Sequence, residues 1–507
     1  MRNAVAGPIE TLSPQICQRA LEARDPRFDG VFFVAITTTR IYCRPICPSR
    51  RAAPGHRRFF PSAAAAEREG FRPCLRCRPE LAPGRAWVDA LSRLASVAAH
   101  RIAAGALNGR SVKSLANDLN VSERHLRRAL HDHLGVSPVE LAQTHRLLLA
   151  KQLLADTTLS VTRIAFASGF QSLRRFNVVF RERYRMSPTD LRRFSSGITR
   201  RVPRPRNGHG RFRETALDEP VRITLAYRPP FTWDHLLAAL RRDATPGVEV
   251  VAGRRYGRTV QLGSAQGCIV VVDAPSEARI RLEISPSLLP ALMPLLTRVR
   301  RLLDLDAQPD VIDAHLAAGG LRWLVQRRPG IRVPGPFDGF EVAMLALLAG
   351  RGQSPEAVRH LAARLTWDLG APLPTGVPLL ERVMPTASRI ADAGPARLIE
   401  MGVGPRRGRI LVALARAVAA DHVRLEPGND PESTRRALLE IDGIGERLAT
   451  TIAMRALYWP DAFSSADRTL QRAANTNGEE ALRTRAEQWR PWRAYAAMHL
   501  WMHACAG

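Results

Sequence analysis

Four of the seven cysteines in this 507-residue chain lie in two close pairs near its amino terminus. The stretch "IYCRPICPSR" holds Cys43 and Cys47, and "PCLRC" holds Cys74 and Cys77. Four thiolates at such spacing suit tetrahedral zinc, which demands little beyond close packing of soft ligands. Unliganded thiols and disulfides are the alternatives, and a structural zinc site is more common than a reactive one. The spacing therefore predicts a Zn(Cys)4 centre.

A second group of chemically suggestive residues lies near the carboxyl terminus. "ALLEIDGIGERLATTIAMR" places Gly443 and Gly445 between two expected helices, the pattern of a helix-hairpin-helix. Glycines there let backbone N–H groups approach a phosphate, helped by a helix N-terminus. Asp467 follows in "DAFSSADRTLQRA", and Trp501 in "WRPWRAYAAMHLWMH". A single Gly-x-Gly turn or a capping aspartate is common, so the prediction rests on the whole set.

A duplicated pattern lies between these two groups. "SVKSLANDLNVSERHLRRALHDHLGVSP" begins at Ser111, and "SVTRIAFASGFQSLRRFNVVFRERYRMSP" begins at Ser160. Each reaches a turn, restarts at a serine suited to N-capping and stops at Ser-Pro, which predicts two helix-turn-helix units. Their second helices would present residue types that reach base edges and phosphates. These residues are Arg124, Arg127 and Arg128 in the first unit, and Arg174, Arg175 and Asn177 in the second.

The remaining patterns indicate a multidomain fold, mainly α with α+β parts. Short β-like runs such as "VRITLAY" and "RIRLEIS" occupy about 221–285, with one helical stretch near Trp233–Arg242. The basic segment "ITRRVPRPRNGHGRFRE" is typical of a linker. The expected parts are a small zinc domain at 1–85, a double helix-turn-helix domain at 86–200, a basic linker at 201–219, a small β-sheet and helix domain at 220–310, and a helix-hairpin-helix domain at 311–507.

The chain carries a net charge of +28, and residues 1–200 hold 33 basic against 15 acidic residues. Such a field attracts polyanions, so double-stranded DNA is the predicted partner. The only lysines are Lys113 and Lys151. Compositional bias can explain the excess of arginine over lysine, but not the excess of basic over acidic residues. No apolar run approaches the roughly 18 residues of a membrane span. With no signal-like start, we expect a cytoplasmic protein without a membrane partner.

The sequence "FFVAITTTRIYCRPICPSR" followed by "GFRPCLRCRPE" resembles the N-terminal domain of the Ada family of bacterial adaptive-response proteins. The resemblance implies that Cys43 irreversibly takes a methyl group from a methylphosphotriester in DNA. It also implies that Thr39, Arg50 and Arg72 hold the DNA backbone. Zinc would keep the sulfur deprotonated. Methylation would then remove negative charge from a dianionic centre, so that a basic domain binds phosphates more tightly.

The duplicated helices resemble the AraC-type DNA-binding domain, which Ada proteins place directly after the zinc domain. This resemblance implies transcriptional activation, with RNA polymerase as an expected partner. Ada would continue with a second methyltransferase domain marked by Pro-Cys-His-Arg, and that motif is absent from this sequence. The carboxyl-terminal half must therefore do something else.

Residues from about 221 to 503 resemble the helix-hairpin-helix DNA glycosylases, in particular the AlkA-type 3-methyladenine DNA glycosylases. The resemblance implies that Gly443 and Gly445 bind DNA. It makes Asp467 the catalytic carboxylate for hydrolysis of the N-glycosidic bond of a flipped nucleotide. It also places Trp501 in the base pocket.

Two departures from the AlkA pattern concern the pocket. At Arg447 and Thr451 the family typically has aromatic residues, so the base pocket is altered. No lysine follows Lys151, and an arginine at position 447 cannot form a Schiff base. We therefore expect a monofunctional glycosylase that excises alkylated purines such as 3-methyladenine. The alternative is a transcriptional regulator whose glycosylase-like half is weak or inactive and only binds DNA.

Overall fold

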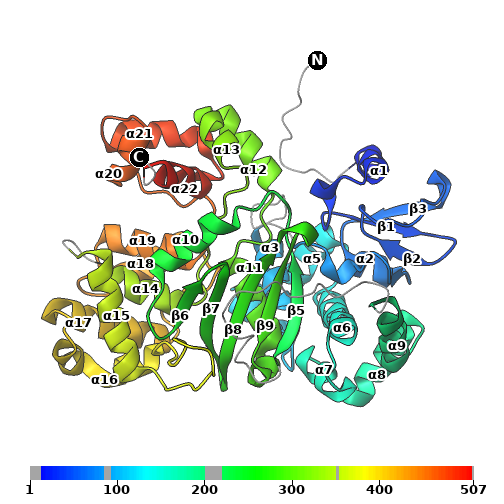
Figure 1. The fold of residues 1–507 in the computed structure, drawn as a ribbon, viewed down its shortest axis with the longest axis horizontal. Helices are drawn as coiled ribbons and strands as arrows, with labels where there is room; N and C mark the ends of the chain where they lie inside the picture. Colours follow the sequence, from blue (N-terminus) through cyan, green and yellow to red (C-terminus); the bar gives the residue numbers. More distant parts are fainter. Residues whose placement is uncertain (1–12, 85–92, 200–219, 350–352, 505–507) are drawn as a thin grey trace.

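The computed structural model describes residues 13–84, 93–199, 220–349 and 353–504. The predicted basic linker at 201–219 lies outside the described residues. The fold is mainly helical with two small sheets, which confirms the predicted fold class (Figure 1). Among the described residues, no helix combines the length and apolar character needed to cross a membrane.

The amino-terminal part is built on a four-stranded sheet of order β3-β1-β2-β4. Its elements are α1 (Pro14–Ala23), β1 (Phe33–Ile36), β2 (Ile41–Cys43), β3 (Arg57–Phe60), α2 (Ala63–Arg68) and β4 (Arg72–Pro73). Strand β1 pairs antiparallel with β2 and β3, whereas β2 and β4 are parallel, with Tyr42 opposite Pro73. Since parallel strands end at the same sheet edge, Cys43 and Cys74 leave the sheet side by side.

Seven helices follow, two helix-turn-helix units joined by the long helix α6. They are α3 (Arg93–Ala103), α4 (Val112–Asp118), α5 (Glu123–Leu134), α6 (Pro138–Asp156), α7 (Val161–Ala167), α8 (Leu173–Tyr184) and α9 (Pro188–Thr199). Serines cap the helices of both repeats, as the sequence predicts: the side chains of Ser122 and Ser172 accept the N–H groups at the starts of α5 and α8. Ser137 forms a capping box with Glu140, so the Ser-Pro that ends the first repeat begins α6.

A second sheet follows, antiparallel throughout, with strand order β5-β9-β8-β7-β6. Its elements and their helices are β5 (Val221–Ala226), α10 (Trp233–Asp243), β6 (Glu249–Ala252), β7 (Arg255–Leu262), β8 (Ala265–Ala274), β9 (Arg279–Ile284) and α11 (Leu292–Leu302). The strands and α10 match the predicted β-like runs and the single helical stretch.

The rest of the chain is helical and has two separate cores. Its helices are α12 (Pro309–Leu316), α13 (Arg322–Arg327), α14 (Gly339–Leu348), α15 (Pro355–Leu369), α16 (Ala387–Glu400), α17 (Pro405–Ala419), α18 (Pro431–Leu439), α19 (Glu446–Ala456), α20 (Arg468–Ala473), α21 (Glu479–Ala486) and α22 (Arg493–Ala504). In Figure 1, α12, α13 and α20 to α22 form one group, and α14 to α19 form the other. The segment between α19 and α20, which contains Asp467, connects the two.

The helix-turn-helix part packs directly on the second sheet. One continuous hydrophobic core contains residues of α6 to α9 and residues of β5, β7, β8, β9 and α11. Polar contacts add to it: Gln152 Nε2 donates to the carbonyl of Thr224 at 2.7 Å, and the Gly84 N–H donates to Asp306 Oδ1 at 3.0 Å. The described residues of 13–199 and those of the carboxyl-terminal half therefore share a buried interface.

Candidate functional site

The four predicted zinc ligands come together. The Sγ atoms of Cys43, Cys47, Cys74 and Cys77 all lie within 4.8 Å of one another, and all four residues are buried. Sulfurs around tetrahedral zinc, at Zn–S distances of about 2.3 Å, lie roughly 3.8 Å apart. The side chains present therefore fit a zinc ion, and zinc is the metal that this chain holds.

Backbone and side-chain contacts fix the loops that carry these cysteines. The N–H of Arg44 points to Cys77 Sγ at 3.4 Å, a bond that favours a thiolate. The guanidinium of Arg44 is buried; it donates to Asp29 Oδ1 at 2.8 Å and to the Cys77 carbonyl at 3.2 Å. The loops after Cys43 and after Cys77 are thus held to each other.

The three residues predicted to hold the DNA backbone lie on the segments that carry the cysteines. Thr39 is in the β1–β2 turn and Arg50 is in the loop after Cys47, and both are exposed. Arg72 is half-buried on β4, opposite Ile41. Their contacts with DNA remain a prediction.

Two further described cysteines contrast with the cluster. Cys17 packs against Phe28 and Phe32, and burial raises the pKa of its thiol to about 11. Cys268 lies on β8 as a fully buried strand residue, as the sequence indicates, and burial raises the pKa of its thiol as well. Both thiols are protonated at neutral pH and are poor nucleophiles.

The predicted recognition residues lie on α5 and α8, the second helices of the two units. Arg124, Arg127 and Arg128 are exposed, as are Arg174 and Arg175. Asn177 is half-buried on α8. Ion pairs within α5 hold two of the arginines: Arg127 contacts Glu123 at 2.5 Å, and Arg128 contacts Asp132 at 3.6 Å. Since such exposed pairs are weak, these guanidiniums can exchange partners for DNA.

The helix-hairpin-helix is formed by α18, the turn at 440–445 and α19. Ile441 and Ile444 anchor the turn from inside, and Gly443 has a φ of 88°. A Cβ atom at Gly443 would lie 2.7 Å from Ile410 Cδ1, whereas one at Gly445 would meet nothing within 4 Å. Gly445 is the N-cap of α19 and offers no side chain to its N–H groups. The start of α19 is therefore open to an anion.

Asp467 is both a helix cap and part of a cavity wall. Its Oδ1 accepts the N–H groups of Thr469 at 2.7 Å and Leu470 at 3.2 Å, which caps α20. Its Oδ2 accepts the indole Nε1–H of Trp501 at 3.1 Å. Sequence reasoning placed Trp501 in the pocket but missed this hydrogen bond, although a half-buried indole N–H generally needs an acceptor.

The cavity has a volume of about 2290 Å³ and lies between the two halves of the molecule. Arg447 and Thr451, the two departures from the AlkA pattern, both line it, together with Asp467 and Trp501. Trp489 does not, since it is fully buried and donates to the carbonyl of Gly319 at 2.9 Å. Four of the residues that the sequence picks out in the carboxyl-terminal half therefore share one cavity, whereas Gly443 and Gly445 do not line it.

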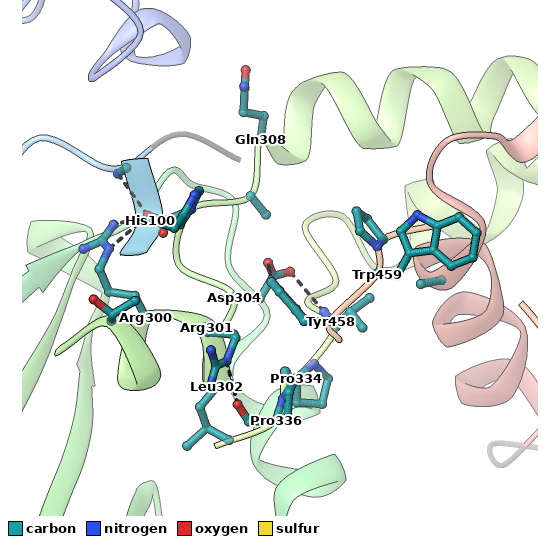
Figure 2. A pocket seen from close by; sticks show the side chains of 18 of the residues that line it. His100, Arg300, Arg301, Leu302, Asp304, Gln308, Pro334, Pro336, Tyr458 and Trp459 are labelled. Atoms are coloured by element: carbon teal, nitrogen blue, oxygen red, sulfur yellow. Dashed lines mark hydrogen bonds and ion pairs between the residues drawn. The ribbon is translucent and has the colours of Figure 1, made fainter. Parts of the chain in front are cut away.

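Sequence reasoning missed Tyr458 and Trp459, which follow α19 and also line the cavity. Figure 2 shows Tyr458 directed at Asp304, with Trp459 beside it. Asp304 is buried, and its other oxygen accepts the hydroxyl of Tyr495 at 2.9 Å. Burial raises the pKa of Asp304 to about 6. This carboxyl group joins α22 to the end of α19, and so fixes the cavity wall around Trp459, which is 40% exposed.

Three family models match successive parts of the chain. They are the metal-binding domain of Ada at residues 16–80, a helix-turn-helix domain at 115–193 and the AlkA N-terminal domain at 222–338. The matches cover the cysteine cluster, both helix-turn-helix units and the second sheet.

Individual relatives extend these matches. A DNA-3-methyladenine glycosylase 2 from Escherichia coli is 30% identical over 278 residues, covering 55% of this chain and 96% of its own. The bifunctional transcriptional activator/DNA repair enzyme AdaA from Bacillus subtilis is 29% identical over 179 residues, covering 35% of this chain and 82% of its own. A probable bifunctional transcriptional activator/DNA repair enzyme AlkA from Mycobacterium tuberculosis is 36% identical over 495 residues, covering 96% of this chain and 95% of its own. Because that similarity spans nearly the whole of both proteins, the chain belongs to the family of bifunctional transcriptional activator/DNA repair enzymes of the AlkA type.

Proposed function

We propose that this protein senses methylated DNA through Cys43, activates transcription through its helix-turn-helix units and excises alkylated purines through Asp467. The working parts are the domains predicted at 1–85, 86–200, 220–310 and 311–507. One observation carries the excision activity: a cavity lined by aromatic side chains reaches a carboxylate that, among the described residues, forms no ion pair. Such a carboxylate is available to a developing cation.

In the sensor reaction, Cys43 Sγ attacks the methyl carbon of a methylphosphotriester. A sulfur–carbon bond forms, the carbon–oxygen bond breaks, and the phosphodiester leaves as an anion. Bound zinc supplies one thing here, a sulfur that is deprotonated at neutral pH. The Arg44–Asp29 pair holds the loop after Cys43 in place. Thr39, Arg50 and Arg72 bind the neighbouring phosphates.

In the excision reaction, a flipped nucleotide enters the cavity. The bond between C1′ and the purine nitrogen breaks, and an N-alkylated purine, which is cationic while attached, leaves as a neutral base. The Asp467 carboxylate stabilises the resulting sugar cation and orients a water molecule, which adds its oxygen to C1′ and loses a proton to solvent water. Trp501 holds Asp467 and offers an aromatic face to the base. Without a cavity lysine, the product is an abasic site and the backbone stays intact.

With zinc bound, the four thiolates would carry one net negative charge more before Cys43 takes a methyl group than after it. The basic amino-terminal part then binds DNA phosphates more tightly, and the units at 115–193 hold the promoter. We propose that RNA polymerase in the cytoplasm is the partner recruited there.

A second candidate is a regulator whose carboxyl-terminal half only holds DNA, and Arg447 and Thr451 at the cavity wall favour it. Incubating the full chain with methylated duplex DNA distinguishes the two. Intact-protein mass spectrometry reads methyl uptake, and chromatography of the supernatant reads free purine. Uptake together with purine release is the expected result. Methyl uptake without purine release would support the second candidate, a regulator without excision activity.

A further inference from the structure

A buried arginine of the carboxyl-terminal half contacts the amino-terminal part of the protein. Arg228 lies in the loop between β5 and α10, and only 3% of its surface is exposed. Its Nη2 donates to the carbonyl of Asp29, which lies 199 positions earlier in the chain, at 2.9 Å. Its Nη1 donates to the carbonyl of Asp306, after α11, at 3.0 Å. Since a buried guanidinium is costly unless its donors are satisfied, these bonds fix Arg228 between the two halves.

The contact at Asp29 is closely packed. Gly30, the next residue, has a φ of 78°. A Cβ atom on Gly30 would lie 2.0 Å from the carbonyl oxygen of Pro83 and 3.4 Å from Nη2 of Arg228. Glycine at this position therefore lets the segment of Asp29 lie directly against Arg228.

Buried groups of the carboxyl-terminal half hold Arg228 from its other side. Its own carbonyl accepts a hydrogen bond from the guanidinium of Arg332, which is itself buried. Nη1 of Arg332 donates in turn to the carbonyl of Asp304 at 3.1 Å. The position of Arg228 is therefore set within the carboxyl-terminal half.

Asp29 is also the residue that holds the cysteine loops together. Its carboxylate accepts the guanidinium of Arg44, the residue directly after Cys43. The N–H and the guanidinium of Arg44 both contact Cys77. The backbone of Asp29 is thus bound by Arg228 while its side chain binds Arg44. A shift of Asp29 would move Arg44, and with it the loops after Cys43 and Cys77.

We propose that Arg228 is a positioning residue for the methyl-accepting centre, the four-cysteine site that contains Cys43. By fixing the backbone of Asp29, it fixes the Asp29–Arg44 pair and the two loops that this pair joins. The inference rests on the proposed methyl transfer to Cys43 and goes beyond it, because the sensor then depends on a residue of the half that excises bases. Groups that orient metal ligands tune the affinity and reactivity of a site. Losing Arg228 therefore weakens zinc binding and misplaces the attacking sulfur.

The test uses the full-length, zinc-bound protein and the variants Arg228→Met and Arg228→Lys. Transfer of zinc to an excess of a chromogenic chelator gives the rate of metal release. Intact-protein mass spectra on a methylphosphotriester duplex give the rate of methyl uptake. For Arg228→Met we expect metal release about tenfold faster and methyl uptake about tenfold slower, the lower end of the range for groups that orient metal ligands, because Arg228 acts through two further residues. Arg228→Lys keeps a charged donor for one carbonyl and should lie between wild type and Arg228→Met.

Arg301→Met is the matched control. The guanidinium of Arg301 also donates to two carbonyls, those of Pro336 at 2.7 Å and Phe337 at 3.0 Å, but both belong to the carboxyl-terminal half. This variant should lower the melting temperature and leave both rates unchanged. If Arg228→Met likewise lowers the melting temperature and keeps both wild-type rates, Arg228 only joins the two halves and the inference is wrong.

A second measurement applies even if Arg228→Met does not fold. Asp29→Asn keeps the carbonyl that Arg228 binds and weakens the pair with Arg44. Combined with Arg228→Lys, it should speed zinc release by less than the product of the two single effects, because both changes act on one pair. A combined effect equal to that product would overturn the inference. Wild type that takes up no methyl group would instead refute the proposed role of Cys43, and zinc release would still test the role of Arg228.

Discussion

Replacing Asp467 by asparagine separates the two roles that one carboxylate plays. Asparagine is as good an N-cap as aspartate, so it retains the bonds to the N–H groups of Thr469 and Leu470. It has only one oxygen, however, and its amide N–H2 must then face the indole N–H of Trp501. Losing that hydrogen bond costs about 1 kcal/mol, and losing the charge at a helix N-terminus costs about 0.3–1 kcal/mol. The fold should survive.

Catalysis should suffer far more. A carboxylate about 4 Å from a sugar cation stabilises it by about 4 kcal/mol at an effective dielectric constant near 20. Removing the charge should then slow the chemical step roughly 1,000-fold. Single-turnover release of 7-methylguanine measures this step. The melting temperature shows whether the fold is retained, and the DNA affinity shows whether DNA binding is retained. We expect affinity close to wild type, because the hairpin at Gly443 and Gly445 is untouched.

The matched control is Asp430→Asn. Asp430 caps α18 through the N–H of Ser433 at 2.8 Å, and its partner Arg93 lies outside the cavity lining. The control should lose some stability and keep the rate of base release. If Asp467→Asn releases base within about tenfold of wild type, the carboxylate is a helix cap and not the group that stabilises the sugar cation.

Three further outcomes are expected. Cys43→Ala should abolish methyl uptake in intact-protein mass spectra and leave base excision intact. The control Cys268→Ala should keep both activities. Methyl uptake by Cys43→Ala would show that another residue is the acceptor. Removing zinc with a chelator should expose four additional reactive thiols and unfold the region around them, with base excision retained; unchanged thiol reactivity would argue against a metal centre. Burial raises the pKa of Glu67 to about 7, so its contribution to stability is present below about pH 4.5 and is lost as the pH rises through 7. Glu67→Gln should therefore gain stability relative to wild type between pH 5.5 and 8, by on the order of 2 kcal/mol in denaturant titrations. The control Glu69→Gln should show no such gain. Equal pH profiles of stability for wild type and Glu67→Gln would contradict this expectation.

Much of the candidate site could be predicted because its signals are local. The paired cysteines, the serine caps of the repeats and the Gly443–Gly445 turn each depend on residues a few positions apart. Backbone hydrogen bonds and glycine conformation settle such features without help from the rest of the chain. The predicted order of the domains and the roles proposed for Cys43 and Asp467 rest on these motifs and their family resemblance.

Other features could not be read from the sequence, because they join residues far apart in the chain. The indole of Trp501 reaches Asp467 from another helix. The hydroxyls of Tyr458 and Tyr495 both donate to Asp304. These hydrogen bonds require the ends of α11 and α19 to lie beside α22. The Ser-Pro at Ser137 ends a repeat in the sequence but begins α6 in the structure.

The sequence by itself determined which groups this protein has: four cysteines placed to hold a metal, two helix-turn-helix units, a glycine hairpin and the carboxylate of Asp467 after it. The tertiary structure alone decided which charged side chains around the cavity have a partner of opposite charge. Arg455 forms an ion pair with Asp243 from α10, whereas Arg447, on the same helix, lines the cavity without a partner in the described part of the chain. The physical reason is that a side chain's type is fixed locally, but the charge it presents to a ligand depends on the neighbours that long-range packing brings to it.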